Sequence, residues 1–169
     1  MLLPWIFVFL VAAGAMLPIR HWLHFPRWND NRSQEFETIW RSSGDLTRHH
    51  PADVIRTVDG DTFEARVHLA SGQDVTTRVR LRGIDAPELK AACPWELQMA
   101  QAATGALRDL LGQGEVAIYN IGPDKYQGRV VADVATKGTG NVAAVLMAAG
   151  HVRSYNGGHR DSWCVRAPR

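Results

Sequence analysis

One short stretch of the sequence carries side chains whose types and spacing could do chemistry together. Residues 80–88 read RLRGIDAPE, an alternating run that begins with Arg80 and ends in a turn with two carboxylates, Asp85 and Glu88. Carboxylates can hold a hard cation, a spare carboxylate can take a proton from water, and a guanidinium can meet phosphate oxygens. This set of side chains is typical of metal-assisted phosphodiester cleavage.

Two other segments offer the same kinds of side chain. Residues 59–62 read DGDT and supply Asp61, and residues 124–129 read DKYQGR and end on Arg129. Each segment alone is also an ordinary turn, because Asp and Gly form turns for purely local reasons. Whether these segments are only turns or also form part of a functional site depends on where the fold places them.

The elements that would position these side chains begin with three strands. Short apolar or alternating runs predict strands over residues 54–58, 62–69 and 75–84. The turn sequence SGQD joins the last two as a hairpin, so the end of one returns to the start of the other. We therefore expect Asp61 beside Asp85, where the two carboxylates repel each other unless a cation lies between them.

A helix, two more strands and a second helix complete the predicted domain. Residues 94–111 start with proline and end before Gly112, which predicts a helix. Its apolar stripe comprises Leu97, Ala100, Ala103, Leu107, Leu110 and Leu111. Strands are predicted over 115–120 and 130–135, and a helix over 142–149. Five short strands with a helix after the third indicate a mainly β, α+β fold, a small and partly open barrel of the OB-fold type.

Spacing leaves the choice among the strand arginines open. Arg78, Arg80 and Arg82 share the polar face of the third predicted strand, which is also what a solvated basic stripe looks like. Lys125 and Tyr126 lie side by side before the arginine of the DKYQGR segment. A cation next to an aromatic ring suits a phosphate and a stacked base, although loops also carry such residues without any function.

The N-terminal segment, residues 1–19, contains no charged side chain, and its length is close to the roughly 20 residues that cross a bilayer. We expect an N-terminal hydrophobic helix that acts as a membrane anchor. A cleaved signal peptide is the alternative, since residues 13–15 (AGA) fit a cleavage site, but no Lys or Arg precedes the apolar run. Residues 20–51 show no lasting period and indicate a linker, which leaves 52–169 as one globular domain.

Taken together, the three segments are similar to the signature segments of the staphylococcal nuclease (thermonuclease) family. They are VDGDT at 58–62, RLRGIDAPE at 80–88 and DKYQGR at 124–129, in the same order and spacing, and the resemblance covers roughly residues 52–155. It implies an OB-fold barrel of the staphylococcal nuclease type and a calcium-dependent nuclease that acts on DNA and RNA. We expect a monomer that takes nucleic acid as substrate and reaches the membrane through residues 1–19.

The resemblance also implies roles by position. The Ca²⁺ ligands are matched by Asp61, Asp85, Ala86 through its backbone carbonyl, and Glu88. Glu88 also matches the residue that activates water. Arg80 is selected among the three strand arginines, and together with Arg129 it matches the pair that binds phosphate. The positions beside the bound nucleotide are matched by Lys125, Tyr126 and Tyr155.

The sequence departs from the family pattern in two regions. Gln127 is an extra residue in the DKYQGR segment, which bears on the reach of Arg129. The third, C-terminal helix of the family is missing or much reduced, and residues 156–164 (NGGHRDSWC) stand in its place. We expect Trp163 to pack there as a cap.

The two cysteines and the overall charge bear on the compartment. The chain has 169 residues, a net charge of +2 and two cysteines, Cys93 and Cys164. An even count permits one disulfide, here Cys93 with Cys164, and so an oxidising compartment, while two unrelated buried thiols are the alternative. The arginines after the apolar segment favour a cytoplasmic side instead. We expect an extracytoplasmic domain, because a nuclease placed there spares the cell's own nucleic acid.

Two other classes of function compete with a phosphodiester hydrolase. Nuclease-like barrels also serve as non-catalytic modules that bind nucleic acid or protein, but such modules are expected to lose carboxylates or arginines that this chain keeps. A polysaccharide-cleaving enzyme also uses paired carboxylates, but it gives the arginines no role. The sequence therefore favours an endonuclease in which Glu88 activates water and Arg80 and Arg129 stabilise the phosphate.

Overall fold

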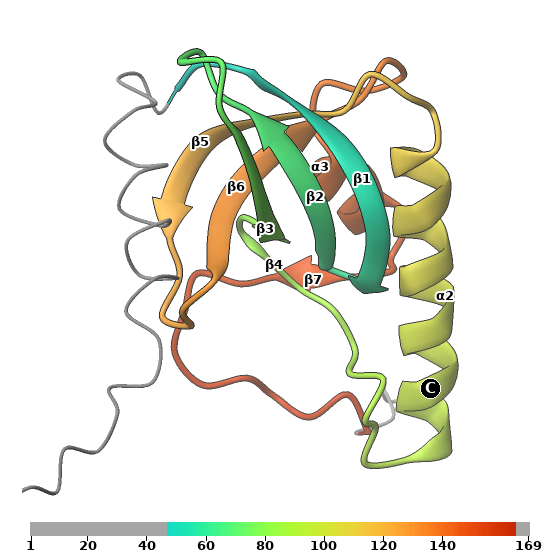
Figure 1. Ribbon diagram of the computed structural model, residues 1–169. Coiled ribbons are helices and arrows are strands. Elements are labelled where there is room, and N and C mark those ends of the chain that lie inside the picture. Colours follow the sequence, from blue (N-terminus) through green and yellow to red (C-terminus); the bar gives the residue numbers. More distant parts are fainter. Residues whose placement is uncertain (1–46, 165–169) are drawn as a thin grey trace, which may run out of the picture.

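The computed structural model describes residues 47–164, and its main body is a closed β-barrel flanked by helices (Figure 1). The strands are β1 (His50–Asp59), β2 (Thr62–His68), β3 (Asp74–Leu81), β4 (Ile84–Asp85), β5 (Ala117–Pro123), β6 (Arg129–Ala135) and β7 (Arg153–Ser154), and the helices are α2 (Pro94–Leu111) and α3 (Val142–Ala148). The barrel order is β1-β2-β3-β6-β5, with β3 and β6 parallel and the other neighbours antiparallel. This architecture fits the predicted α+β barrel of the OB-fold type.

The barrel is closed where the sequence predicted a partly open one. β1 begins at His50, earlier than the predicted strand, and its first two residues pair with Ile118 and Ala117 of β5. His50 and Ala52 point inward and are buried. A histidine followed by a proline gives a weak strand signal, so the closing pairs were missed.

The predicted anchor or signal segment 1–19 and most of the predicted linker 20–51 lie outside the described residues. Over residues 47–164, no helix is both long enough and apolar enough to span a membrane.

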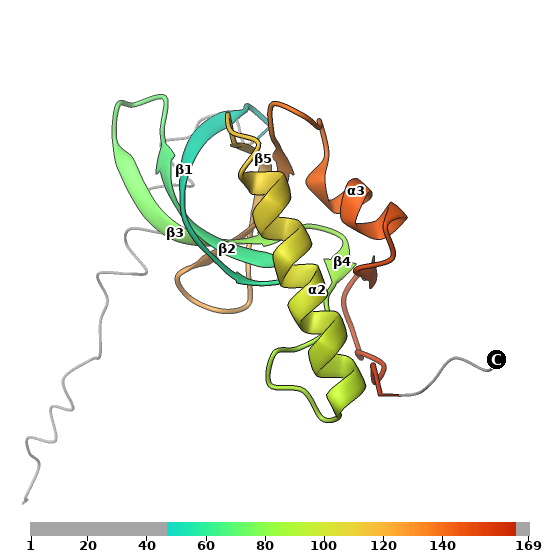
Figure 2. The same cartoon turned by 90° about the vertical axis from the view of Figure 1, so that its right-hand side faces the viewer.

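The core fills the barrel and extends beneath the two helices. Phe63, Val79 and Val130 are fully buried in the barrel, and α2 packs on β1 while α3 packs on β6 (Figures 1 and 2). Helix α2 has the predicted bounds, but the predicted stripe was wrong at its first member. Leu97 is 38% exposed, and the neighbouring Glu96 is buried at 7%.

Glu96 is buried because its carboxylate accepts hydrogen bonds from the backbone of the loop that precedes α2. It accepts hydrogen bonds from the backbone N–H of Ala92 at 2.8 Å and of Glu88 at 3.4 Å. A buried carboxylate needs such donors, since it loses its hydration on folding. Glu96 therefore fixes the loop that follows the acidic turn after β3.

The end of the described chain returns to that acidic turn. β4 pairs with β7 through Ile84 with Ser154 and Asp85 with Arg153, and the pairing lies at the lower end of the barrel (Figure 1). Among residues 47–164 no helix follows α3, in agreement with the shortened C-terminal part expected from the sequence. Cys93 and Cys164 form a disulfide with their Cα atoms 5.9 Å apart, which ties the start of α2 to the end of the described chain.

Candidate functional site

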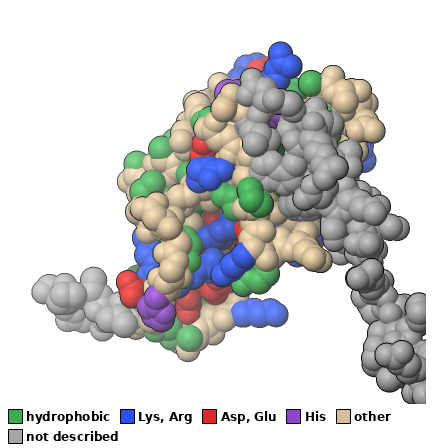
Figure 3. All heavy atoms as spheres, turned by 90° about the vertical axis from the view of Figure 1, so that its left-hand side faces the viewer, with side chains coloured by type: hydrophobic (Ala, Val, Ile, Leu, Met, Phe, Trp, Pro, Cys, Tyr) green, Lys and Arg blue, Asp and Glu red, His purple; other side chains and the backbone are tan. Residues whose placement is uncertain are grey.

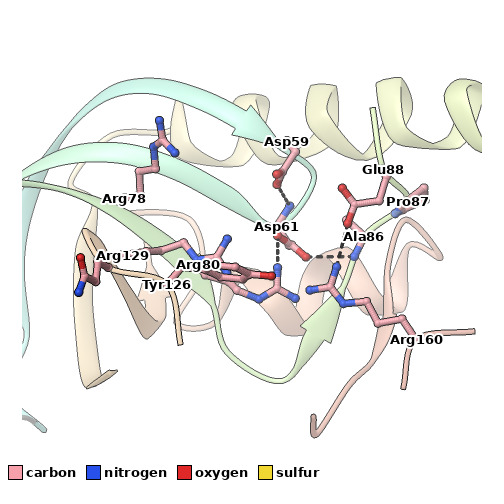
Figure 4. Close-up of a pocket in the computed structure, with 11 residues that line it drawn as sticks. Asp59, Asp61, Arg78, Arg80, Ala86, Pro87, Glu88, Tyr126, Arg129 and Arg160 are labelled. Carbon is pink, nitrogen blue, oxygen red and sulfur yellow. Dashed lines mark hydrogen bonds and ion pairs between the residues drawn. The ribbon is translucent and has the colours of Figure 1, made fainter. Parts of the chain in front are cut away.

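Two adjoining cavities lie at the lower end of the barrel, and three arginines, Arg80, Arg129 and Arg160, line both. The first cavity has a volume of about 340 Å³ and the carboxylates Asp59, Asp61 and Glu88 in its wall (Figure 4). The second has a volume of about 730 Å³ and adds Lys125 and Tyr155. Figure 3 shows Lys and Arg side chains gathered around a few Asp and Glu side chains on the lower part of one face.

Asp61 and Arg80 form the centre of the first cavity, and the hairpin register places them there. Thr62 of β2 lies opposite Arg80 of β3, so the residue before Thr62 reaches the arginine. Arg80 Nη1 lies 2.5 Å from Asp61 Oδ1, and Nη2 donates to the carbonyl of Ile84 at 2.9 Å. Both residues are buried, at 3% and 8% exposure. The guanidinium is therefore fixed from two sides.

The structure separates the three strand arginines that the sequence left together. Arg80 is buried in the site, whereas Arg78 is exposed at the cavity wall, apart from the Asp61–Arg80 pair (Figure 4). Arg82 follows the end of β3 and lines only the second cavity, with Nη2 donating to the carbonyls of Asn120 and Val131. Strand alternation puts all three on one face, but only Arg80 meets a buried carboxylate.

Asp85 lies just behind the first cavity and is 1% exposed. Its Oδ2 accepts hydrogen bonds from Arg153 at 2.8 and 3.1 Å and from the Trp163 indole at 3.3 Å. Arg160 Nε lies 3.1 Å from Oδ1, but the angles do not make a hydrogen bond, so Oδ1 is buried without one. The backbone N–H of the next residue, Ala86, donates to Asp61 Oδ2 at 3.2 Å. This hydrogen bond brings Asp61 next to the turn that carries Asp85, as the hairpin predicted.

The two remaining acidic side chains differ in their surroundings. Glu88 is exposed, with 55% of its side chain accessible, and its Oε1 accepts a hydrogen bond from Arg160 at 2.8 Å. Asp59 is largely enclosed, and burial together with the negative charge of Asp61 raises the pKa of Asp59 to about 6. Close to neutral pH, Asp59 therefore binds a proton far more readily than an ordinary aspartate.

The DKYQGR loop brings the second predicted arginine into the site despite the extra Gln127. Gly128 has a φ of 77°, which turns the loop so that Arg129 starts β6 opposite Arg78 of β3. Arg129 Nε donates to Asp124 Oδ2 at 2.9 Å, and its guanidinium lies over the Tyr126 ring at 4.7 Å. Burial opposes ionisation of Asp124, but the bonds from Arg129 and the Tyr126 N–H lower the pKa of Asp124 overall.

The residues predicted to contact nucleotide are divided between the two cavities. Tyr126 lines the first and is 56% exposed, while Lys125 and Tyr155 line the second. The Tyr155 hydroxyl donates to the carbonyl of Gly158 at 2.8 Å. An exposed aromatic ring beside two arginine-rich hollows offers a stacking surface.

Sequence reasoning gave no role to Arg153, Arg160 and Glu96, which the structure places around the acidic turn. A signal for Arg160 was present in the cysteines. Pairing of Cys164 with Cys93 carries the chain back to within a few residues of Glu88. Applied to residues 156–164, that constraint would have pointed to an arginine near the site.

Potential metal ligands cluster closely at one place beside the site. Within the part of the chain that the structure describes, one group of three potential ligands has its atoms within 4.8 Å of one another: Cys93, Glu96 and Cys164. The two cysteines are consumed by the disulfide and offer no thiolate. Asp61, Asp85 and Glu88 do not all approach so closely. Their oxygen atoms are nevertheless of the hard type that Ca²⁺ prefers, and the buried Asp85 Oδ1 lacks a hydrogen bond.

Comparison with known proteins identifies the family. The model of the staphylococcal nuclease homologue family matches residues 78–162, which is just over half of the chain. The chain belongs to the staphylococcal nuclease family. It is also 30% identical over 145 residues to a Bacillus subtilis (strain 168) protein named endonuclease YhcR, an alignment that covers 74% of this chain and 12% of that protein. The chain thus spans only a small part of this relative's length.

The family match also bears on individual residues. It begins within β3 and runs through the end of the DKYQGR loop to the segment after β7, so it includes Arg80, Glu88, Arg129 and Arg160. Asp61 lies before the matched residues and is connected to them through its ion pair with Arg80. A staphylococcal nuclease-like chain that keeps these side chains around one cavity supports a nuclease-like function.

Proposed function

We propose that this protein is a metal-dependent endonuclease that hydrolyses phosphodiester bonds in DNA and in RNA. The observation that carries the proposal is the first cavity, where the buried Asp61–Arg80 pair, Glu88 and Arg129 surround one hollow of about 340 Å³. Family membership and the name of the Bacillus subtilis relative support the same class of reaction. The arginines speak against a polysaccharide substrate, which carries no phosphate.

Arg80 and Arg129 bind the phosphate. Negative charge grows on the phosphate oxygens as water attacks, and a planar guanidinium can donate to two of them at once. Arg80 is held by Asp61 and Ile84, and Arg129 by Asp124, so neither arginine has to be ordered when substrate arrives. Donors that are fixed in advance stabilise the transition state without a reorganisation penalty.

Glu88 takes the proton from the attacking water. Its carboxylate faces the first cavity and is exposed enough to reach solvent, unlike Asp61 and Asp85, which are buried. A general base needs hydrogen-bond access to the water that it deprotonates. Of these three predicted acidic residues, Glu88 is the one with that access.

Asp61, Asp85 and Glu88, with the backbone carbonyl of Ala86, would hold the metal ion. All four offer oxygen atoms, which suits Ca²⁺ better than a softer metal, and the buried Asp85 Oδ1, which accepts no hydrogen bond, already faces a cation in the Arg160 guanidinium. Held by these oxygen atoms, Ca²⁺ would supply positive charge that stabilises the charge developing on the phosphate. The chain itself supplies the arginines that line the same cavity.

A cleavage assay tests this function directly. The full chain is incubated with single-stranded DNA or RNA in the presence of Ca²⁺ or of a chelator that removes it. We expect cleavage with Ca²⁺ and its loss with the chelator. No cleavage under either condition, or cleavage unaffected by the chelator, would contradict the proposal.

A non-catalytic module that binds nucleic acid is the second candidate, and one observation favours it. Asp61, Asp85 and Glu88 are each paired with an arginine, so their charges are already compensated within the chain. Such a module would bind single-stranded DNA and leave it intact at every Ca²⁺ concentration. Binding measured beside cleavage distinguishes the two functions.

The disulfide also supports a location for this activity. Disulfides persist in oxidising compartments, and Cys93–Cys164 joins two segments that flank the site. We place the nuclease domain outside the cytoplasm, where the predicted N-terminal segment would either anchor or export it.

A further inference from the structure

Residues 155–164, named here the C-terminal strap, run past the acidic side of the first cavity and are fixed at both ends. At the start, the N–H of Tyr155 donates to the carbonyl of Gly83 at 2.8 Å, next to the β4–β7 pairing. At the other end, Cys164 is bonded to Cys93 just before α2. Between these ends, Arg160 reaches toward Glu88 and Asp61 (Figure 4).

Arg160 is the only partner of the Glu88 carboxylate among residues 47–164, and it donates from Nη1 to Oε1 at 2.8 Å. With 55% of its side chain accessible, Glu88 gains little from packing. A glutamate side chain that loses its single partner regains rotamer freedom, which spreads its carboxylate over several positions. The direction of the Glu88 carboxylate therefore depends on Arg160.

Arg160 is itself held by contacts within the strap and behind the cavity. Its Nε lies 3.1 Å from Asp85 Oδ1, and its guanidinium lies 5.3 Å from the centre of the Tyr155 ring. Asp85 is held in turn by Arg153, which lies over the Trp163 ring at 4.2 Å. The position of Arg160 thus follows from buried Asp85 and from the two anchored ends of the strap.

We infer that Arg160 is a positioning residue, which holds the Glu88 carboxylate toward the first cavity. The C-terminal strap, which the Cys93–Cys164 disulfide closes, places Arg160 beside Glu88. The inference rests on the proposed role of Glu88 in activating water. Misplacing a catalytic group by about 1 Å lowers a rate by roughly a hundredfold. Loss of Arg160 should therefore act on the chemical step more than on substrate binding.

The experiment compares kcat and KM of the full chain carrying Arg160→Met with those of Arg66→Met. Arg66 is an exposed arginine on β2 that lines neither cavity, so its variant controls for the loss of one positive charge. We expect Arg160→Met to lower kcat by about tenfold to a hundredfold with KM nearly unchanged, and Arg66→Met to change neither. Arg160→Lys, which keeps the charge beside Asp85, should lose less activity.

A double substitution separates positioning from direct contact with substrate. In a Glu88→Gln background, Arg160→Met should lower kcat no further, because its effect passes through Glu88. A further loss of the same size, or an effect confined to KM, would overturn the inference and assign Arg160 to phosphate binding. If Arg160→Met does not fold, Arg160→Lys is compared with Arg66→Lys, and equal kcat values for those two would likewise overturn it.

A readout that needs no activity keeps this inference apart from the proposed function. The ¹³C resonance of the Glu88 side-chain carboxyl should move in Arg160→Met and stay in place in Arg66→Met. An unmoved resonance would overturn the inference even in an active enzyme. If the resonance moves in Arg160→Met but the wild-type protein cleaves nothing, the contact is supported and the nuclease function is contradicted.

Discussion

Glu88 is the most exposed of the three acidic residues that line the first cavity, where Asp59 is half-buried and Asp61 is buried. Asp61 is enclosed by Arg80 and the backbone N–H of Ala86, and Asp85 is held by Arg153. Among the described residues, the carboxylate of Glu88 has Arg160 as its one partner. This difference matters because a base must exchange protons with water, whereas a ligand need not. The geometry therefore assigns different tasks to carboxylates of similar chemistry.

The substitution Glu88→Gln should reduce turnover far more than binding. The amide keeps the shape of the side chain but cannot accept a proton, so we expect kcat to fall by about a hundredfold or more. Arg80 and Arg129 remain in place, so affinity for single-stranded DNA in a fluorescence anisotropy titration should change little. Equal losses in turnover and in affinity would assign Glu88 to substrate binding instead.

His68 makes stability depend on pH. Its ring lies between Asp74, 2.7 Å from Nδ1, and Asp53, 3.1 Å from Nε2. The hydrogen bond to Asp74 contributes most to raising the pKa of His68 above 6.5. A raised pKa in the folded state means that the stabilisation is fully present below the unfolded pKa and is lost as pH rises through the folded value.

The corresponding experiment compares wild type with His68→Gln in urea. The wild type should be the more stable of the two at about pH 5.5, and the difference should shrink by about pH 8.5, where the imidazole is neutral in both states. If the stability difference between wild type and His68→Gln grows as the pH rises, the ion pairs of His68 with Asp53 and Asp74 do not stabilise the protein. His68 lies at the end of β2 remote from Asp61 and lines neither cavity, so activity is not expected to follow this change.

At the scale of elements, the turn between β1 and β2 is pressed against α2. A Cβ placed on Gly60 would lie 2.6 Å from the Cβ of Ala103 and 2.8 Å from that of Ala86. These distances are too short for two carbon atoms, so glycine is required here by close approach rather than by its backbone angles. The same contact holds Asp59 and Asp61 against the acidic turn.

Gly60→Ala should therefore destabilise the protein and impair the site together. Overpacking of this kind costs about 1–3 kcal/mol in the free energy of unfolding, measured by urea denaturation. Gly105→Ala is the matched control, since its Cβ would meet open space on α2 and should stabilise the helix by about 0.5–1 kcal/mol. Equal effects of the two substitutions would show that the turn can move away from the helix.

At the scale of the whole molecule, the disulfide joins the start of α2 to the end of the C-terminal strap. Cys93 and Cys164 are separated by 71 positions, so the bond closes a loop that contains most of the second half of the domain. Closing a loop of this length restricts the unfolded chain, which stabilises the folded state by about 4 kcal/mol in the chain-entropy model. The bond also fixes one end of the C-terminal strap.

Replacing both cysteines by serine should lower the melting temperature and, through the freed strap, lower kcat as Arg160→Met does. A thiol reductant should produce the same two effects on the wild type, measured by thermal denaturation and by the cleavage assay. The double-serine variant controls for other actions of the reductant, because it should not respond further. Unchanged stability and activity after complete reduction would show that the strap stays in place without its disulfide.

Much of the architecture was predictable because it is local. Alternation predicted β2 and all of β3 except its first residue, although the predicted strand ran on to Ile84 whereas β3 ends at Leu81. A proline start with a glycine stop predicted the observed bounds of α2. The early start of β1 and the two-residue pairing of β4 with β7 were not predictable, since both depend on partners distant in the sequence. Short strands of this kind carry too few residues to show a period.

The residues of the first cavity divide in the same way. The sequence by itself determined that Asp61, Asp85, Glu88, Arg80 and Arg129 are present in segments of the family type, because residue types and short spacings are properties of the chain. Only the tertiary structure decided that Arg80 is enclosed while Arg78 and Arg82 are not, since one strand face meets different neighbours along its length. Arg160 entered the site for the same reason. Strand pairing and a disulfide bring it beside Glu88, and no local spacing relates two residues 72 positions apart.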